Sequence, residues 1–185
     1  AVFGNSGTRF GAIGDLVRRA LVIDPSGDCV WIDRDTIDPR YRSTALEGHV
    51  VLEVELQLSS APTEEIRERV EDYRNYRRAT QPPGSGTLGC FFKNPPDASA
   101  GALIDRAGLK GTGCGGAVVS ERHANFLLNR GGATASDFRA LAREVQRVVA
   151  ARYGVTLDPE VHLWGNTPSR VDALRAKPVF SRDRA

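Results

Sequence analysis

The chain has 185 residues, of which 26% are charged, and its formal net charge is only +2. This length allows a sizeable hydrophobic core, and the near-neutral charge argues against a nucleic-acid-binding protein, which would carry a concentrated basic face. No apolar run approaches the ~20 residues that a membrane-spanning helix needs, and the first residues lack the pattern of a signal peptide.

The cysteines and histidines are few and scattered. Cys29, Cys90 and Cys114 are odd in number and have no paired spacing, which disfavours a disulfide framework and predicts a reduced, cytoplasmic setting. The three histidines and the cysteines do not follow the spacing of a zinc site, so we expect no metal.

The first third of the chain reads as strands. Residues 19–34 predict a hairpin around the turn cluster at 24–27, and residues 50–58 alternate apolar and polar side chains as a strand does. A helix is then expected from Thr63, with Glu64 and Glu65 in its first turn. The break between 58 and 63 is the candidate domain boundary.

The rest of the chain mixes short elements without regular strand–helix alternation, which predicts an α+β fold. After a loop at 80–96 we expect a helix over 98–107, two short strands around the polar turn 121–123, and a long helix over 136–153 that Gly154 ends. A last short strand is expected at 161–165, and residues 166–185 read as a flexible basic tail.

One glycine pattern is misleading. Gly111, Gly113 and Gly116 match the dinucleotide-binding motif G-x-G-x-x-G, but that motif must follow a strand and open a helix. Here a helix precedes the glycines and a strand follows them, which favours a closely packed loop.

Three short stretches carry candidate chemistry. In "GCFFKNP", Cys90 is close in sequence to Lys93 and Asn94. A nearby ammonium group favours the use of a thiol as an acid or nucleophile. The alternative is that Cys90 is a buried cysteine that only packs with apolar side chains. Tyr41 and Arg42 in "PRYRST" form either a surface pair or a clamp for a carboxylate. Glu160 in "LDPEVHLWG" is either a solvated charge or a partly buried carboxylic acid.

Together these stretches resemble the UDP-N-acetylenolpyruvoylglucosamine reductases, flavoenzymes of peptidoglycan precursor synthesis. The resemblance follows one order along the chain, from residue 1 to about 165. The blocks that carry it are "AVFGNSG", "YRST", "RRATQP" with "GCFFKNP", "AGALIDRAGLKG", "VSERHANFLLN" and "LDPEVHLWG".

The resemblance implies a reaction and a set of roles. NADPH reduces bound FAD, and the flavin delivers hydride to the enolpyruvyl double bond of UDP-N-acetylglucosamine enolpyruvate. By resemblance, Arg42 and a protonated Glu160 meet the substrate carboxylate and Cys90 donates the proton. Substrate contacts are expected from Tyr41, Lys93, Asn94, His123 and Asn125, and flavin contacts from Asn5 and Gly7.

The chain departs from the family pattern in two ways. Many members have serine where this chain has Cys90, and members have a further segment before "AVFGNSG" that holds the flavin pyrophosphate, so an N-terminally truncated chain is expected. On this view residues 1–59 are part of the FAD-binding domain and 60–165 are the substrate domain. The chain is expected to be monomeric. The alternative is a non-catalytic module that binds the UDP-sugar without turnover.

Overall fold

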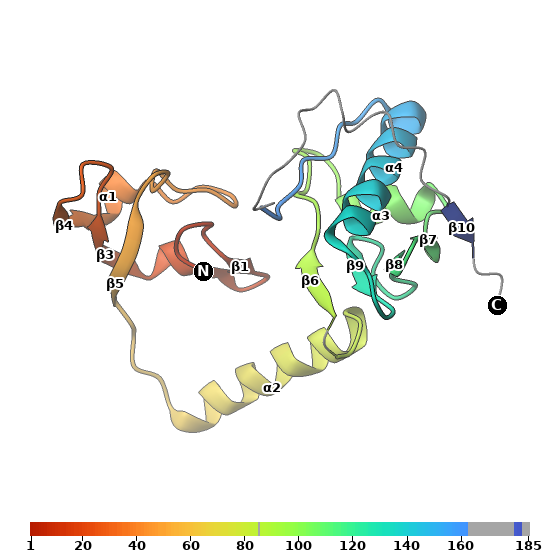
Figure 1. Ribbon diagram of the computed structural model, residues 1–185. Coiled ribbons are helices and arrows are strands. Elements are labelled where there is room, and N and C mark those ends of the chain that lie inside the picture. The colour runs from red at the N-terminus through yellow and green to blue at the C-terminus, as the bar shows by residue number, and fades with distance from the viewer. Residues whose placement is uncertain (85, 163–179, 183–185) are drawn as a thin grey trace. The chain divides into compact units, whose positions relative to one another are not determined.

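A computed structural model describes residues 1–84, 86–162 and 180–182 of the chain. The chain divides into two compact units, Ala1–Arg67 and Glu68–Ala185, and each has its own hydrophobic core. Within the described residues, no helix combines the length and the apolar character needed to cross a membrane. The division falls inside a helix, a few residues after the boundary expected at 58–63 (Figure 1).

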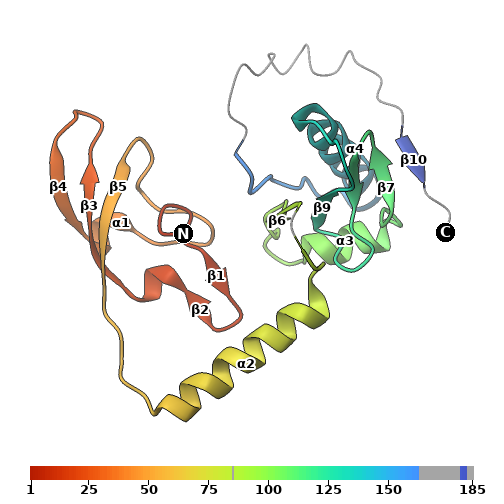
Figure 2. The ribbon, with the colours of Figure 1, turned by 60° about the horizontal axis from the view of Figure 1, so that its bottom comes forward.

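The first unit is built on a three-stranded antiparallel sheet in the order β4-β3-β5 (Figure 2). A separate pair of two-residue strands precedes it, and Val22, Ile37 and Leu46 are fully buried in the core. The elements are β1 Gly7–Thr8, β2 Gly11–Ala12, the short 3-10 helix Ile13–Asp15, β3 Val17–Ile23, β4 Cys29–Asp33, α1 Arg34–Ile37 and β5 Val50–Leu56.

The predicted hairpin is confirmed as β3 and β4. The Asp24 carboxylate accepts hydrogen bonds from the backbone N–H groups of Ser26 and Asp28, and Gly27 has the positive φ (+96°) that the turn requires. Turn chemistry at 24–28 therefore sets the register of the two strands.

The prediction that β5 alternates strictly between two faces is wrong. Val54 pairs with Ala20 and Val51 pairs with Val22, so both valines reach the core although they lie three residues apart. A β-bulge between these pairs shifts the strand by one residue and leaves Leu52 51% exposed.

The second unit contains a five-stranded antiparallel sheet in the order β10-β7-β8-β9-β6, and α3 and α4 contribute to the same core (Figure 1). Phe92, Ile104 and Leu141 are among the fully buried side chains. Helix α2, Thr63–Thr80, begins in the first unit and ends in the second. The further elements are β6 Thr87–Cys90, α3 Ala100–Arg106, β7 Thr112–Cys114, β8 Ala117–Val119, β9 Phe126–Asn129, α4 Ala135–Tyr153 and β10 Phe180–Arg182.

The predicted helices are confirmed, with small shifts at their ends. At the start of α4 the side chains of Thr134 and Asp137 form a reciprocal capping box, and Gly154 closes the helix in the left-handed conformation (φ +68°). Ser99 caps α3 by accepting a hydrogen bond from the N–H of Ala102. The helix α2 begins at Thr63 as expected, and none of its residues is buried.

Several expectations for the second unit do not hold in full. The loop expected at 80–96 contains strand β6, and the glycine segment, expected to be a closely packed loop, contains strand β7. Of the strand expected at 161–165, Val161 and His162 are not in a strand, and 163–165 lie outside the described residues; nearby, Pro159 forms an isolated bridge with Phe92. Most of the predicted tail lies outside the described residues, but its part at 180–182 is not loose, because it forms β10 and pairs with β7.

Candidate functional site

In the first unit, Tyr41 and Arg42 form the tip of a tight turn. The backbone groups of Arg40 and Ser43 pair with each other, with N···O distances of 2.9 and 3.3 Å. Arg42 adopts a left-handed backbone conformation (φ +54°), and its guanidinium carbon lies 5.5 Å from the centroid of the Tyr41 ring. Such a conformation is costly for a residue other than glycine, so the surrounding contacts must hold the turn in place.

Asn5 provides one of these contacts. Its side-chain Nδ2 donates to the Arg40 carbonyl at 2.8 Å, and its Oδ1 accepts from the Gly14 N–H at 2.9 Å. The residue is only 8% exposed, so its amide is directed at the protein backbone. Asn5, predicted from sequence to contact a flavin, therefore has the geometry of a residue that fixes the turn carrying Arg42.

Gly7 lies directly beside Arg42. A Cβ atom added to Gly7 would lie 3.3 Å from the Arg42 Nη1 atom, so glycine lets the guanidinium approach the main chain. A Cβ atom on Gly4 would meet open space. At Gly4 the loop therefore has main chain without a side chain, and at Gly7 a permanent positive charge lies close to it, an arrangement that suits a planar ring such as that of a flavin.

In the second unit, the stretch that follows Cys90 is held from both sides. On one side, the Phe91 N–H donates to the Asn125 carbonyl at 2.7 Å. On the other side, the Phe91 carbonyl accepts from the Glu160 N–H at 2.8 Å, and the Lys93 N–H donates to the Asp158 carbonyl at 2.8 Å. The structure therefore brings Cys90 and Glu160, 70 positions apart in the sequence, onto neighbouring stretches of backbone.

Local sequence explains this pairing. Gly89 has a positive φ (+81°) at an irregularity in the pairing of β6 with β9, and such a bulge re-aims the residues that follow it. Pro159 lies opposite Phe92, between the hydrogen bonds that Asp158 and Glu160 make. Proline has no N–H, and this pairing does not need one from Pro159. Phe91 and Phe92 are 3% and 1% exposed, so they anchor the stretch in the core.

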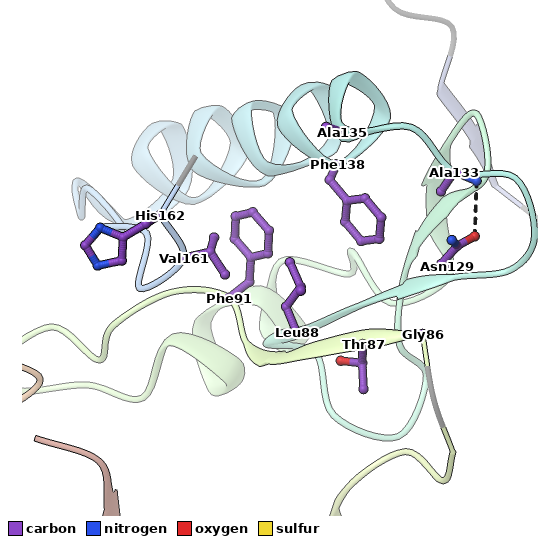
Figure 3. A pocket seen from close by; sticks show the side chains of 10 residues that line it. All are labelled: Gly86, Thr87, Leu88, Phe91, Asn129, Ala133, Ala135, Phe138, Val161 and His162. Atoms are coloured by element: carbon purple, nitrogen blue, oxygen red, sulfur yellow. Dashed lines mark hydrogen bonds between the residues drawn. The ribbon is translucent and has the colours of Figure 1, made fainter. Parts of the chain in front are cut away.

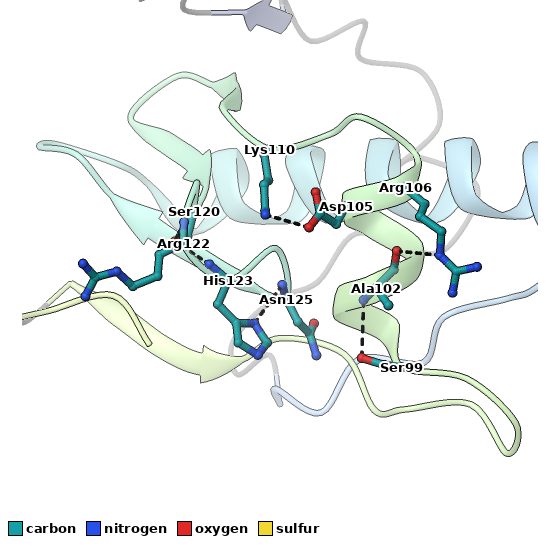
Figure 4. A network of polar contacts seen from close by, with 9 residues as sticks. All are labelled: Ser99, Ala102, Asp105, Arg106, Lys110, Ser120, Arg122, His123 and Asn125. Carbon is teal, nitrogen blue, oxygen red and sulfur yellow. Dashed lines mark hydrogen bonds and ion pairs between the residues drawn. The ribbon is translucent and has the colours of Figure 1, made fainter. Parts of the chain in front are cut away.

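His123 and Asn125 lie together in the turn before β9 (Figure 4). The His123 Nδ1 accepts a hydrogen bond from the Asn125 N–H at 3.3 Å, and burial lowers the pKa of His123 below its ordinary value. A neutral imidazole that accepts at Nδ1 carries its proton on Nε2, so His123 can serve as a donor there. Asn125 is 2% exposed, and both atoms of its side-chain amide bind the backbone of Phe92.

Lys93 and Asn94 follow on the same stretch. Lys93 is half-buried, and the Asn94 Oδ1 accepts a hydrogen bond from the Ala100 N–H at the start of α3, at 3.0 Å. The amide of Asn94 thereby ties the stretch to the helix. Asn5, Gly7, Tyr41 and Arg42 belong to the first unit and the other candidates to the second, so the structure describes the two groups separately.

A cavity of about 540 Å³ lies in the second unit, between β6 and the start of α4. Leu88, Phe91, Phe138 and Val161 point into it (Figure 3). None of the predicted site residues lines this cavity, which is mainly apolar. Its remaining lining residues are Gly86, Thr87, Asn129, Ala133, Ala135 and His162.

Sequence reasoning missed the residues that act through backbone contacts. Gly14 receives the Asn5 side chain, and a Cβ atom there would lie 2.4 Å from the Pro39 Cβ atom. Neither Gly14 nor Pro159 carries reactive chemistry, and their partners are distant in sequence. No local signal could have singled them out.

Comparison with known proteins gives consistent matches. Residues 81–164 match the family model described as UDP-N-acetylenolpyruvoylglucosamine reductase, C-terminal domain. The UDP-N-acetylenolpyruvoylglucosamine reductase of Desulfosudis oleivorans is 45% identical over 174 residues, which cover 89% of this chain and 56% of that protein. The enzyme of the same name from Geobacter metallireducens is 43% identical over 162 residues, covering 87% of this chain and 54% of the relative.

Two further matches extend the comparison. A Bacillus licheniformis sequence of the same name is 35% identical over 168 residues, covering 89% of this chain and 91% of its own length. The crystal structure of UDP-N-acetylenolpyruvylglucosamine reductase from Thermus caldophilus has a TM-score of 0.80 at 37% identity, covering 89% of this chain and 59% of that one. The chain spans about half the length of the first two relatives.

Proposed function

The chain belongs to the UDP-N-acetylenolpyruvoylglucosamine reductase family, and on this premise we propose that it takes part in reducing UDP-N-acetylglucosamine enolpyruvate to UDP-N-acetylmuramate during peptidoglycan precursor synthesis. The observation that carries the proposal is the placement of Cys90 beside the Glu160 segment, through the hydrogen bond from the Glu160 N–H to the Phe91 carbonyl. We assign residues 1–59 to the flavin-binding part and 60–165 to the substrate domain, in a cytoplasmic monomer.

The cofactors are FAD and NADPH. When bound, FAD supplies the hydride that reduces the alkene, after it has itself been reduced by NADPH. The main chain at Gly4 would lie against the ring, because a Cβ atom there meets no atom within 4 Å, and Gly7 would let the Arg42 guanidinium lie close to the same loop. Asn5 keeps this loop joined to the turn of Arg42.

The side chains act on the two ends of the alkene. Hydride addition leaves negative charge delocalised into the substrate carboxylate, and Arg42 offsets that charge, because a guanidinium is always protonated. Glu160, in its protonated form, donates a hydrogen bond to the same carboxylate. Cys90 then gives its thiol proton to the other alkene carbon.

The remaining candidates bind the substrate. Lys93 offers an ammonium group to the diphosphate, and Asn94, Tyr41 and His123 offer donors to its polar groups. His123 would donate from Nε2, because its Nδ1 accepts from the Asn125 N–H.

A first experiment separates this function from a binding module without turnover. The purified chain is examined for flavin absorbance, and UDP-N-acetylglucosamine enolpyruvate is titrated into it by calorimetry. A yellow chain that consumes NADPH supports the enzyme. A colourless chain that binds the nucleotide sugar supports the module, and absence of both flavin and sugar binding contradicts the proposal.

A second experiment concerns Cys90. Cys90→Ala should lower turnover by roughly 10²- to 10⁴-fold, the usual contribution of a proton donor, while flavin oxidation by the substrate is reduced less. The matched control is Cys29→Ala, since Cys29 is an exposed cysteine on β4. Stopped-flow absorbance follows both steps, and equal turnover in the wild type and Cys90→Ala removes Cys90 from the mechanism.

A further inference from the structure

A single side chain satisfies the backbone of Phe92. The Asn125 Oδ1 accepts from the Phe92 N–H at 2.9 Å, and the Asn125 Nδ2 donates to the Phe92 carbonyl at 2.8 Å. The main-chain carbonyl of Asn125 also accepts from the Phe91 N–H at 2.7 Å. Three hydrogen bonds therefore join one asparagine to two consecutive residues directly after Cys90.

The carboxamide of asparagine has the same donor and acceptor as a peptide group, so it can replace the backbone of a neighbouring strand. Such a replacement is needed at this point. The pairing of β6 with β9 reaches Cys90 and Phe126, and beyond Phe126 the chain turns away through His123 (Figure 4). The Asn125 side chain extends the pairing by one residue where the β9 backbone ends.

Asparagine is also the residue that fits this task chemically. An aspartate would keep the acceptor for the Phe92 N–H but would place a second oxygen against the Phe92 carbonyl. An alanine would leave both groups of Phe92 without these partners in a site where Asn125 itself is 2% exposed, and unpaired buried groups are costly.

The opposite side of the same stretch carries Glu160. The Glu160 N–H binds the Phe91 carbonyl, and the Lys93 N–H binds the Asp158 carbonyl, both at 2.8 Å. Phe91 is hydrogen-bonded to Asn125 through its N–H and to Glu160 through its carbonyl. The contacts from Asn125 therefore fix the position of the backbone after Cys90 relative to the backbone of Glu160. We propose that Asn125 is a positioning residue that aligns Cys90 with Glu160, and that it does not itself contact the substrate. This inference rests on the proposed function of Cys90 and Glu160.

The first test uses the unaltered chain. Amide hydrogen exchange by NMR should show the Phe92 N–H protected to the same order as the Phe91 N–H, although Phe92 has a side chain and not a strand as its partner. Exchange of the Phe92 N–H at least about 100-fold faster than that of Phe91 would overturn the proposal, because an intact hydrogen bond must open before exchange.

The second test compares Asn125→Asp with the matched control Asn129→Asp. Among the described residues, the Asn129 side chain binds through its oxygen alone, which accepts from Gly131 at 2.9 Å and from Ala133 at 3.1 Å. Aspartate preserves both bonds, of which Figure 3 shows the one to Ala133. At position 125, aspartate preserves the bond to the Phe92 N–H and loses the bond to the carbonyl. The expected signature is a changed ¹³C shift of the Phe92 carbonyl with the Phe92 N–H still protected, which a general loss of stability would not produce.

Thiol alkylation then reports the position of Cys90, resolved site by site by mass spectrometry. In Asn125→Asp the alkylation rate of Cys90 should rise about tenfold, because the loss of one buried hydrogen bond has an effect of this size. In Asn129→Asp the rate should not rise. Exposed Cys29 and buried Cys114 are internal references and should not change. An unchanged rate at Cys90 contradicts the proposal.

The outcomes distinguish failure of the proposed function from failure of the positioning role of Asn125. If Cys114 also becomes reactive in Asn125→Asp, the variant has unfolded, and the exchange rate of Phe92 in the unaltered chain decides. If the unaltered chain does not bind UDP-N-acetylglucosamine enolpyruvate, the proposed function fails, whereas the alkylation of Cys90 still tests the alignment. Weaker sugar binding in Asn125→Asp with unaltered Cys90 alkylation would instead support a direct substrate contact.

Discussion

Gly14 shows how a residue without a side chain can support a site. A Cβ atom at position 14 would lie 2.4 Å from the Pro39 Cβ atom and 2.7 Å from the Asn5 Oδ1 atom, distances that real Cβ atoms do not show. Gly14→Ala should therefore destabilise the first unit by about 1–3 kcal/mol, the usual cost of overpacking. Urea denaturation followed by tryptophan fluorescence measures this change, in a Trp164→Phe background so that Trp31 alone reports.

The control for this substitution is Gly4→Ala, because a Cβ atom on Gly4 meets no atom within 4 Å. We expect its effect on the free energy of unfolding to be within about 0.5 kcal/mol of zero, as for other substitutions away from packed contacts. Equal stability of Gly14→Ala and Gly4→Ala would mean that the contact between Gly14 and Pro39 is not maintained in solution.

The sequence predicted residues with reactive side chains better than residues that hold the backbone of the site in place. Cys90 and Glu160 could be singled out because thiols and carboxyl groups carry chemistry, and the structure brings their segments together. The tasks of Asn5 and Asn125 could not be predicted, because the partners of an amide depend on which backbone groups the fold places beside it. Both amides bind main-chain atoms more than 30 positions away.

The capping box of α4 is an element whose strength depends on pH. The pKa of Asp137 is lowered from its ordinary 3.8, chiefly because the Thr134 N–H donates to its carboxylate at 2.8 Å. These hydrogen bonds favour the ionised form, so the stabilisation is complete above pH 3.8 and is lost as the pH falls through the lower pKa of the folded state. Asp137→Asn should be less stable than the wild type at neutral pH.

Chemical denaturation at a series of pH values tests this expectation. The difference in stability between the wild type and Asp137→Asn should shrink as the pH falls below 3.8. Thr134→Ala removes the other half of the box and should cost about 1 kcal/mol, as other N-cap residues do. A difference between the wild type and Asp137→Asn that does not vary with pH would contradict the role of the Asp137 charge.

Elements with a strong local signal were predictable, and elements that depend on distant partners were not. Capping residues, the position of Gly154 and the turn at 24–28 mark α4 and the first hairpin in the sequence itself. Strand β6 has few β-branched residues and is formed by pairing with β9. The bulge in β5 likewise arises from its pairing with β3, which no pattern within β5 reveals.

For the whole molecule, the main structural fact is the presence of two separate cores. Leu46 is fully buried in the first unit and Leu141 in the second. Leu46→Ala and Leu141→Ala should each cost about 2–5 kcal/mol of stability, the usual range for a leucine deleted from a core. Because the two residues share no partners, we expect the costs to be additive in the double variant.

Hydrogen exchange followed by mass spectrometry locates the effect of each substitution. Leu46→Ala should increase exchange in β3–β5, and Leu141→Ala should increase it in β7–β9. An increase in β7–β9 caused by Leu46→Ala would show that the two cores unfold as one. The α+β class was predictable from the order of the elements, whereas the division inside α2 was not, because a helix continues through it.

The bridge between Phe92 and Pro159 has a thermodynamic consequence for Glu160. Among the described residues, two backbone hydrogen bonds join 158–160 to the stretch after Cys90, and each contributes only about 0.5–1.5 kcal/mol in net terms. These two bonds are a small part of what holds the segment, because Leu157 on one side of it is fully buried and Val161 on the other side packs against the same core. The segment of Glu160 is thus fastened through its neighbours in the chain, and the stretch after Cys90 through Asn125.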